Sequence, residues 1–177
     1  MNSDIREILV TEDKIRETVS ALAKCINADY KGKTPILMII LKGSAVFSTD
    51  LMRLLDMKIL VDFMQVSSYG DGTVSGELVI SKDCENDVNG KDVLIIEDII
   101  DTGNTLAALR KLLEERGANV EICALLSKPS RRETEVSAKY IGMEIPDEFV
   151  VGYGLDYAEM YRNLPYVGIL KREVYKK

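Results

Sequence analysis

The stretch that decides the fold is VLIIEDIIDTGNTL, which runs from Val93 to Leu106. Its first four residues are apolar, as in a strand that is covered on both faces of a sheet. Two acids, two isoleucines and a turn follow, and a helical pattern begins at about Thr105. In parallel α/β sheets, ligands bind where a strand ends and the next helix begins. The stretch therefore predicts an α/β fold and the place of its binding site.

The turn suits a phosphate, because the first amides of a helix and the positive end of its dipole attract an anion. Gly103 permits a tight turn, and Thr102 and Thr105 add hydroxyl donors. Glu97 and Asp98 would repel a bare phosphate, so their natural partners are hydroxyls or a metal ion. A ribose 5-phosphate offers a phosphate and a diol in one ligand.

The two common nucleotide-binding motifs are absent from the chain. It has no G-x-x-x-x-G-K-[ST] loop, and neither Gly70-x-Gly72 nor Gly152-x-Gly154 is followed by the third glycine of a dinucleotide motif. Without a ligand, Asp101 or Thr102 would simply cap the helix while the acids face water. The presence of both acids in register with a glycine-bearing turn favours the ligand site.

Strands and helices alternate on both sides of this stretch, which predicts one domain over residues 1–177 with a largely parallel sheet. In the second expected strand, the alternation of Ile59, Val61 and Phe63 indicates one apolar face. Residues 67–77 hold three glycines and few apolar side chains, as in a lid or a hairpin connection. The expected helices are 11–30, 44–55 and 105–116, and the expected strands are 36–41, 57–66, 93–96, 120–126, 140–141, 149–151 and 166–170.

The composition excludes several classes of catalytic site and disfavours some partners. The absence of histidine excludes Ser-His-Asp and Cys-His nucleophiles, H-E-x-x-H zinc sites and imidazole acid-base catalysis. A net charge of -6 disfavours nucleic-acid and anionic-membrane partners. Three separated cysteines, no signal-peptide pattern and no apolar run of membrane length predict a cytoplasmic protein.

The run from Ile95 to Thr105 resembles the phosphoribosyl-pyrophosphate motif of the type I phosphoribosyltransferases, most closely that of their hypoxanthine-guanine branch. The resemblance covers nearly the whole chain and implies the fold of that family: a mainly parallel twisted sheet flanked by helices, with a small hood from residues near the N-terminus and about 140–177. The other blocks in the family order are LKG at 41–43, SY at 68–69, LSK at 126–128, IPD at 145–147 and the most specific one, FVVGYGLDY at 149–157.

The resemblance implies a purine-salvage transferase that uses Mg²⁺. Hypoxanthine or guanine and 5-phosphoribosyl-1-pyrophosphate would give IMP or GMP and pyrophosphate, through an oxocarbenium-like transition state without a covalent intermediate. Such chemistry needs no histidine. Because relatives form dimers and tetramers, a homodimer or homotetramer is expected.

The resemblance also implies roles around the turn. Asp101 is similar in position to the general base that takes the proton from N7 of the purine. The backbone and hydroxyls of Asp101, Thr102, Gly103, Asn104 and Thr105 would hold the 5-phosphate, with no role for the Asn104 side chain. Glu97 and Asp98 would meet the ribose hydroxyls, directly or through the metal.

Pyrophosphate contacts are implied further away in the sequence. The segment Leu41-Lys42-Gly43 would hold a non-proline cis peptide before Lys42 whose amides bind pyrophosphate, and Arg162 resembles a second pyrophosphate contact. Ser68 and Tyr69 would lie on a lid over the donor. Judged alone, a lysine after a strand, such as Lys42, is more often a surface residue.

Purine contacts are implied in the last third of the chain. Lys128 would donate to the 6-oxo group and Phe149 would stack on the base, whereas alone they suggest a solvated lysine and a core phenylalanine. The carbonyls of Val150 and Asp156 would meet the 2-amino group of guanine. The Asp156 carboxylate resembles a ligand to a second magnesium ion.

Two alternatives stay open at this point. A sister enzyme would use xanthine, adenine or orotate; Lys128 and the block at 149–157 disfavour adenine and orotate but do not separate xanthine from the other 6-oxopurines. A regulatory RNA-binding protein on the same fold would need a basic face, which the acidic charge disfavours.

Overall fold

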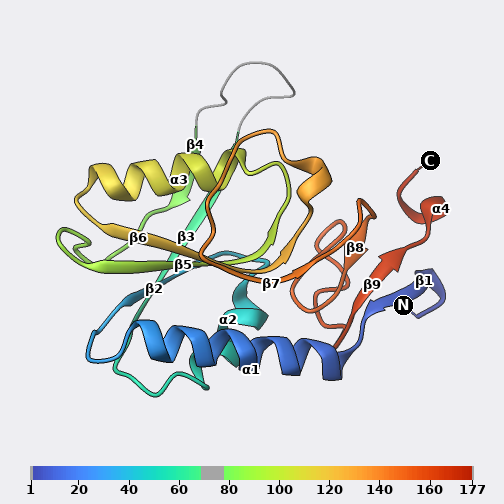
Figure 1. The fold of residues 1–177 in the computed structure, drawn as a ribbon. Helices are drawn as coiled ribbons and strands as arrows, with labels where there is room; N and C mark the ends of the chain where they lie inside the picture. Colours follow the sequence, from blue (N-terminus) through green and yellow to red (C-terminus); the bar gives the residue numbers. More distant parts are fainter. Residues whose placement is uncertain (1, 69–77, 177) are drawn as a thin grey trace.

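The computed structural model describes residues 2–68 and 78–176 (Figure 1). In these residues the strands form a six-stranded sheet, in the order β4-β3-β2-β5-β6-β7, and a three-stranded sheet, in the order β1-β9-β8. The strands are β1 (Ile5–Val10), β2 (Ile36–Ile40), β3 (Leu60–Ser68), β4 (Leu78–Lys82), β5 (Asp92–Ile100), β6 (Asn119–Ser127), β7 (Tyr140–Glu144), β8 (Val150–Val151) and β9 (Val167–Leu170). The helices are α1 (Glu12–Asp29), α2 (Ala45–Met52), α3 (Asn104–Glu115) and α4 (Arg172–Tyr175), with 3₁₀ turns at Asn2–Asp4 and Pro129–Arg131.

The larger sheet confirms the predicted α/β class. β2 pairs in parallel with β3 and β5, and β5, β6 and β7 continue the parallel arrangement; β4 is antiparallel to β3. Helix α3 covers one face, while α1 and α2 cover the other (Figure 1). All five residues of β2 are buried because this central strand is covered on both faces.

Helices α1 and α3 match the sequence predictions closely at their ends. α1 is capped by Thr11, whose side chain accepts a hydrogen bond from the Lys14 amide. α3 begins after Gly103 and is followed by Gly117, both with φ of 88°. Gly117 therefore ends the helix as predicted, because glycine enters the left-handed region without steric cost.

The predicted apolar face of the second strand was wrong. Val61 and Phe63 are exposed, and Asp62 between them is buried. The Asp62 carboxylate accepts hydrogen bonds from the backbone amides of Glu85 and Asn86 at 2.9 and 2.7 Å. These amides satisfy the buried Asp62 carboxylate. Because they lie far away in the sequence, the alternation of residues within the strand could not indicate that Asp62 is buried.

Two other predicted boundaries were also wrong. The strand expected at 93–96 extends to Ile100, so Glu97 and Asp98 lie inside β5, and α2 ends at Met52. Ser67 and Ser68 belong to the end of β3, while residues 69–77 lie outside the described residues. The two strands that flank this segment, β3 and β4, pair antiparallel.

The smaller sheet joins the two ends of the chain. β9 lies between β1 and β8 and is antiparallel to both. Figure 1 shows these strands together at one end of the molecule, where both termini lie. Within the described part of the chain, no helix combines the length and the apolar character that crossing a membrane would require.

Candidate active site

Two consecutive acids, Glu97 and Asp98, lie inside β5 close to its carboxyl end. Asp98 is buried and its Oδ1 accepts a hydrogen bond from the Ile99 amide at 2.7 Å, whereas Glu97 is partly exposed. Burial raises the pKa of both carboxyls, and the nearby Asp98 raises the pKa of Glu97 further. Such a pair favours a ligand that brings hydroxyl donors or positive charge, because hydrogen bonds or a nearby cation offset the repulsion between the two carboxylates.

The turn after β5 borders a cavity of about 250 Å³. Thr102, Gly103 and Thr105 line it together with Glu97 and the end of β2. The cavity therefore lies where the sequence predicted a phosphate, at the carboxyl end of a parallel strand and the start of a helix.

A neighbouring segment fixes this turn. The Thr102 carbonyl accepts hydrogen bonds from the amides of Glu133 and Thr134 at 3.0 and 3.1 Å. The Asp101 carboxylate accepts a hydrogen bond from Arg131 Nε at 3.0 Å. The Asn104 side chain forms hydrogen bonds with the side chains of Glu133 and Thr134, which link the start of α3 to the same segment.

Gly43 is in close contact with Asp98. The peptide between Leu41 and Lys42 is cis, as the family resemblance implied. A Cβ added at Gly43 would lie 1.8 Å from Asp98 Oδ2, and one added at Gly154 would lie 2.0 Å from the Gly43 carbonyl oxygen. At this point three segments meet: the residues after β2, the carboxyl end of β5 and the loop after β8. A side chain larger than glycine at position 43 or 154 would overlap its neighbour.

Charged side chains surround this meeting point. Arg162 Nη2 lies 2.8 Å from Asp156 Oδ1, and Arg162 Nη1 donates to the Gly154 carbonyl at 2.7 Å. Lys42 Nζ lies 2.9 Å from Glu159 Oε2. Sequence reasoning missed Glu159, although its position three residues before Arg162 in a tight loop was a signal for an ion pair.

The predicted purine residues lie directly after β6 and in or beside β8. Lys128 is buried after β6, and its Nζ is 4.0 Å from Asp147 Oδ1, the limit for an ion pair. Phe149 is 37% exposed, and its ring stacks on Tyr175 with 4.7 Å between centroids. Tyr175 was missed because nothing in its local sequence links α4 to Phe149. Val150 is buried in β8.

Of the two predicted lid residues, Tyr69 lies outside the described residues and Ser68 is the last residue of β3.

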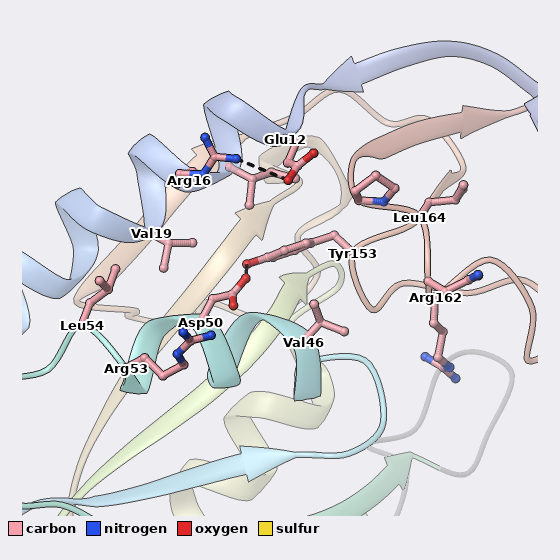
Figure 2. A pocket seen from close by; sticks show the side chains of 13 residues that line it. Glu12, Arg16, Val19, Val46, Asp50, Arg53, Leu54, Tyr153, Arg162 and Leu164 are labelled. Atoms are coloured by element: carbon pink, nitrogen blue, oxygen red, sulfur yellow. Dashed lines mark hydrogen bonds and ion pairs between the residues drawn. The ribbon is translucent and has the colours of Figure 1, made fainter.

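A larger cavity of about 650 Å³ lies elsewhere, between α1, α2 and residues 153–165 (Figure 2). Asp50 and Tyr153 form a 2.7 Å hydrogen bond in it, and Arg162 points away from that pair. Because this cavity contains neither β5 acid, the smaller one fits the predicted chemistry better.

The model of the phosphoribosyl transferase domain family matches residues 7–158, and the chain belongs to this family. Among its relatives, a Staphylococcus aureus protein named hypoxanthine-guanine phosphoribosyltransferase is 52% identical over 99% of both chains. This confirms the family predicted from the sequence.

Comparison with solved structures agrees with this family assignment. The chain is similar to the Staphylococcus aureus hypoxanthine phosphoribosyltransferase, with a TM-score of 0.96 and 51% identity over 100% of this chain and 97% of that chain. A Trypanosoma cruzi hypoxanthine phosphoribosyl transferase, described for the role of its C-terminal region in oligomeric state and activity, has a TM-score of 0.91 and 39% identity, covering 97% of this chain and 94% of that one.

Proposed function

We propose that this protein transfers the 5-phosphoribosyl group of phosphoribosyl pyrophosphate to hypoxanthine or guanine, forming IMP or GMP and releasing pyrophosphate. The observation that carries the proposal is the contact of Gly43 with Asp98 and of Gly154 with Gly43 beside the cavity at the β5 turn. Three segments with separate family motifs meet there, on one domain whose hood is the three-stranded sheet. The relatives that share this whole chain carry the same activity in their names.

Each part of the site receives one part of the substrates. The turn from Asp101 to Thr105 holds the 5-phosphate, and Glu97 and Asp98 face the ribose hydroxyls. The amides beside the cis peptide before Lys42 and the Arg162 side chain face the pyrophosphate. As the bond from C1 to pyrophosphate breaks and the bond to the purine nitrogen forms, Asp101 takes the N7 proton. The protein contributes positioning and charge stabilisation rather than a covalent intermediate.

The acids also fit magnesium. Among residues 2–68 and 78–176, no three acidic or cysteine side chains lie close enough to form a protein-only metal site. Mg²⁺ commonly binds one or two carboxylates together with substrate phosphates, so this arrangement suits a metal that arrives with the donor. Glu97 and Asp98 would hold one ion and the Asp156 carboxylate a second, and Mg²⁺ would neutralise charge on the leaving pyrophosphate.

The proposal is tested by measuring pyrophosphate release from phosphoribosyl pyrophosphate with each purine in turn. We expect release with hypoxanthine and guanine and none with adenine; release with adenine alone would contradict the proposal. Removing Mg²⁺ with excess chelator should abolish release, and restoring Mg²⁺ should recover it. Full activity in the chelator would contradict the metal requirement.

Lys128 is the proposed selector of 6-oxopurines, because its buried ammonium can donate to a 6-oxo group but not to the 6-amino group of adenine. Lys128→Ala should lower kcat/KM for hypoxanthine roughly 10- to 100-fold, as expected for a hydrogen bond to a charged group. The KM for the donor should stay near the wild-type value. Lys128→Met keeps the aliphatic stem and should show the same loss; equal losses for purine and donor would refute the assignment.

We further propose a cytoplasmic homodimer or homotetramer. The Trypanosoma cruzi relative, whose oligomeric state has been related to its C-terminal region, supports self-association. An RNA-binding role on this fold is disfavoured by the net charge of -6, and filter binding at low and high salt would detect it.

A further inference from the structure

Glu159 lies in a two-residue turn with an uncommon backbone. Tyr157 and Met160 exchange hydrogen bonds of 3.2 and 3.0 Å, and between them Ala158 and Glu159 have φ of 50° and 64°. Turns with two positive φ values normally contain asparagine or glycine. Non-glycine residues in this region are uncommon and concentrate where a site requires them.

The turn directs the Glu159 carboxylate at two cations. Its Oε2 is 2.9 Å from Lys42 Nζ and 3.5 Å from Arg162 Nη2. The Glu159 amide donates to Asp156 Oδ2 at 3.0 Å, which fixes the turn beside Arg162. Lys42 is the main cause of the lowered pKa of Glu159. One carboxylate oxygen of Glu159 therefore contacts both cations, and Lys42 lies 117 positions before Glu159 in the chain.

We propose that Glu159 is an internal substitute for pyrophosphate: it pairs with Lys42 and Arg162 and must be displaced when a pyrophosphate group binds. This inference rests on the proposed function, which assigns Arg162 and the backbone amides around Lys42 to pyrophosphate and thereby brings that group beside both cations. The Lys42 and Glu159 side chains are 53% and 64% exposed, and exposed ion pairs are weak. A more highly charged anion can therefore displace the carboxylate, and Glu159 sets the affinity for donor and product.

The test is the affinity for magnesium pyrophosphate, measured by isothermal titration calorimetry. Glu159→Gln keeps the shape of the side chain and removes its charge. We expect about fivefold tighter binding, the effect of removing one charge at about 4 Å in water. The KM for phosphoribosyl pyrophosphate should fall by a similar factor, while the KM for hypoxanthine stays unchanged.

Two variants control for net charge and for structure. Glu115→Gln removes one exposed acid that pairs with Lys111 on α3, and it should leave pyrophosphate affinity unchanged. Glu159→Asp retains the charge and should bind pyrophosphate close to the wild-type affinity. Thermal melting of each variant identifies any loss of folding. If Glu159→Gln does not fold, the affinity of Glu159→Asp for pyrophosphate still shows whether a negative charge at this position weakens binding.

The outcomes separate this inference from the proposed function. If wild-type protein binds pyrophosphate and Glu159→Gln binds it equally or more weakly, Glu159 does not compete and the inference is wrong. Tightening of the same size in Glu115→Gln or Glu159→Asp would also overturn it. Failure of the wild-type protein to bind magnesium pyrophosphate would instead contradict the proposed function.

Discussion

Replacing Asp101 with asparagine is expected to lower the rate of nucleotide formation by roughly 10²–10⁴-fold, the usual contribution of a positioned acid-base group. Asparagine keeps the size of the side chain but cannot accept the N7 proton. The carboxylate lies beside the turn that borders the small cavity, where Arg131 Nε donates to it at 3.0 Å. Single-turnover measurement with saturating donor and hypoxanthine reports this step.

A second aspartate separates the loss of a base from the loss of an ion pair. Asp83 pairs with Arg116 at 2.7 Å on another part of the surface, so Asp83→Asn breaks the same kind of contact. Arg116 holds the pKa of Asp83 at about 2, and this pair should therefore matter for stability. Asp83→Asn should lower the melting temperature but not the rate. A wild-type rate in Asp101→Asn would remove Asp101 from the role of base.

Gly43→Ala should lower kcat/KM for the donor by about 10²-fold or more, because a displacement near 1 Å in a site costs this much. The new Cβ would overlap Asp98 Oδ2, which lies 1.8 Å from its position. The other oxygen of Asp98 accepts a bond from the Ile99 amide, so the carboxylate cannot move without losing that contact. Kinetics with varied donor, together with thermal melting, would measure the effect.

Gly90→Ala provides the matched glycine control. Gly90 has φ of 68° and no atom within 4 Å of an added Cβ, so alanine there adds backbone strain without a contact. It should cost about 1 kcal/mol of stability and no activity. If Gly43→Ala retained full activity in a folded protein, the contact with Asp98 would have no part in donor binding.

Local sequence predicted much of the scaffold. The strand, turn and helix around Val93 to Leu106 follow from an apolar run, a glycine and helical spacing, all of which act over a few residues. The same is true of the end of α3 at Gly117. The family blocks then indicated the activity class and the cis peptide before Lys42, which periodicity alone does not encode.

The alternation in β3 shows where local reasoning fails. Val61 and Phe63 looked like an apolar face, yet Asp62 is the buried residue because amides more than 20 positions away satisfy its charge. Whether a polar side chain can be buried depends on its partners, and partners are set by packing. The partial burial of Glu97 and the burial of Asp98 inside β5 likewise depend on packing and not on the local pattern.

The sequence by itself determined that this chain has a largely parallel α/β sheet and a glycine-bearing turn between β5 and α3, because periodicity and turn chemistry are local properties. Only the tertiary structure decided that Gly43 lies against Asp98, that Tyr175 stacks on Phe149, and that Glu159 joins Lys42 to Arg162. These contacts depend on the strand order that sets β2 beside β5 and on the folding of the chain ends into one sheet. Distances between segments far apart in the sequence are products of packing, so no short motif can specify them.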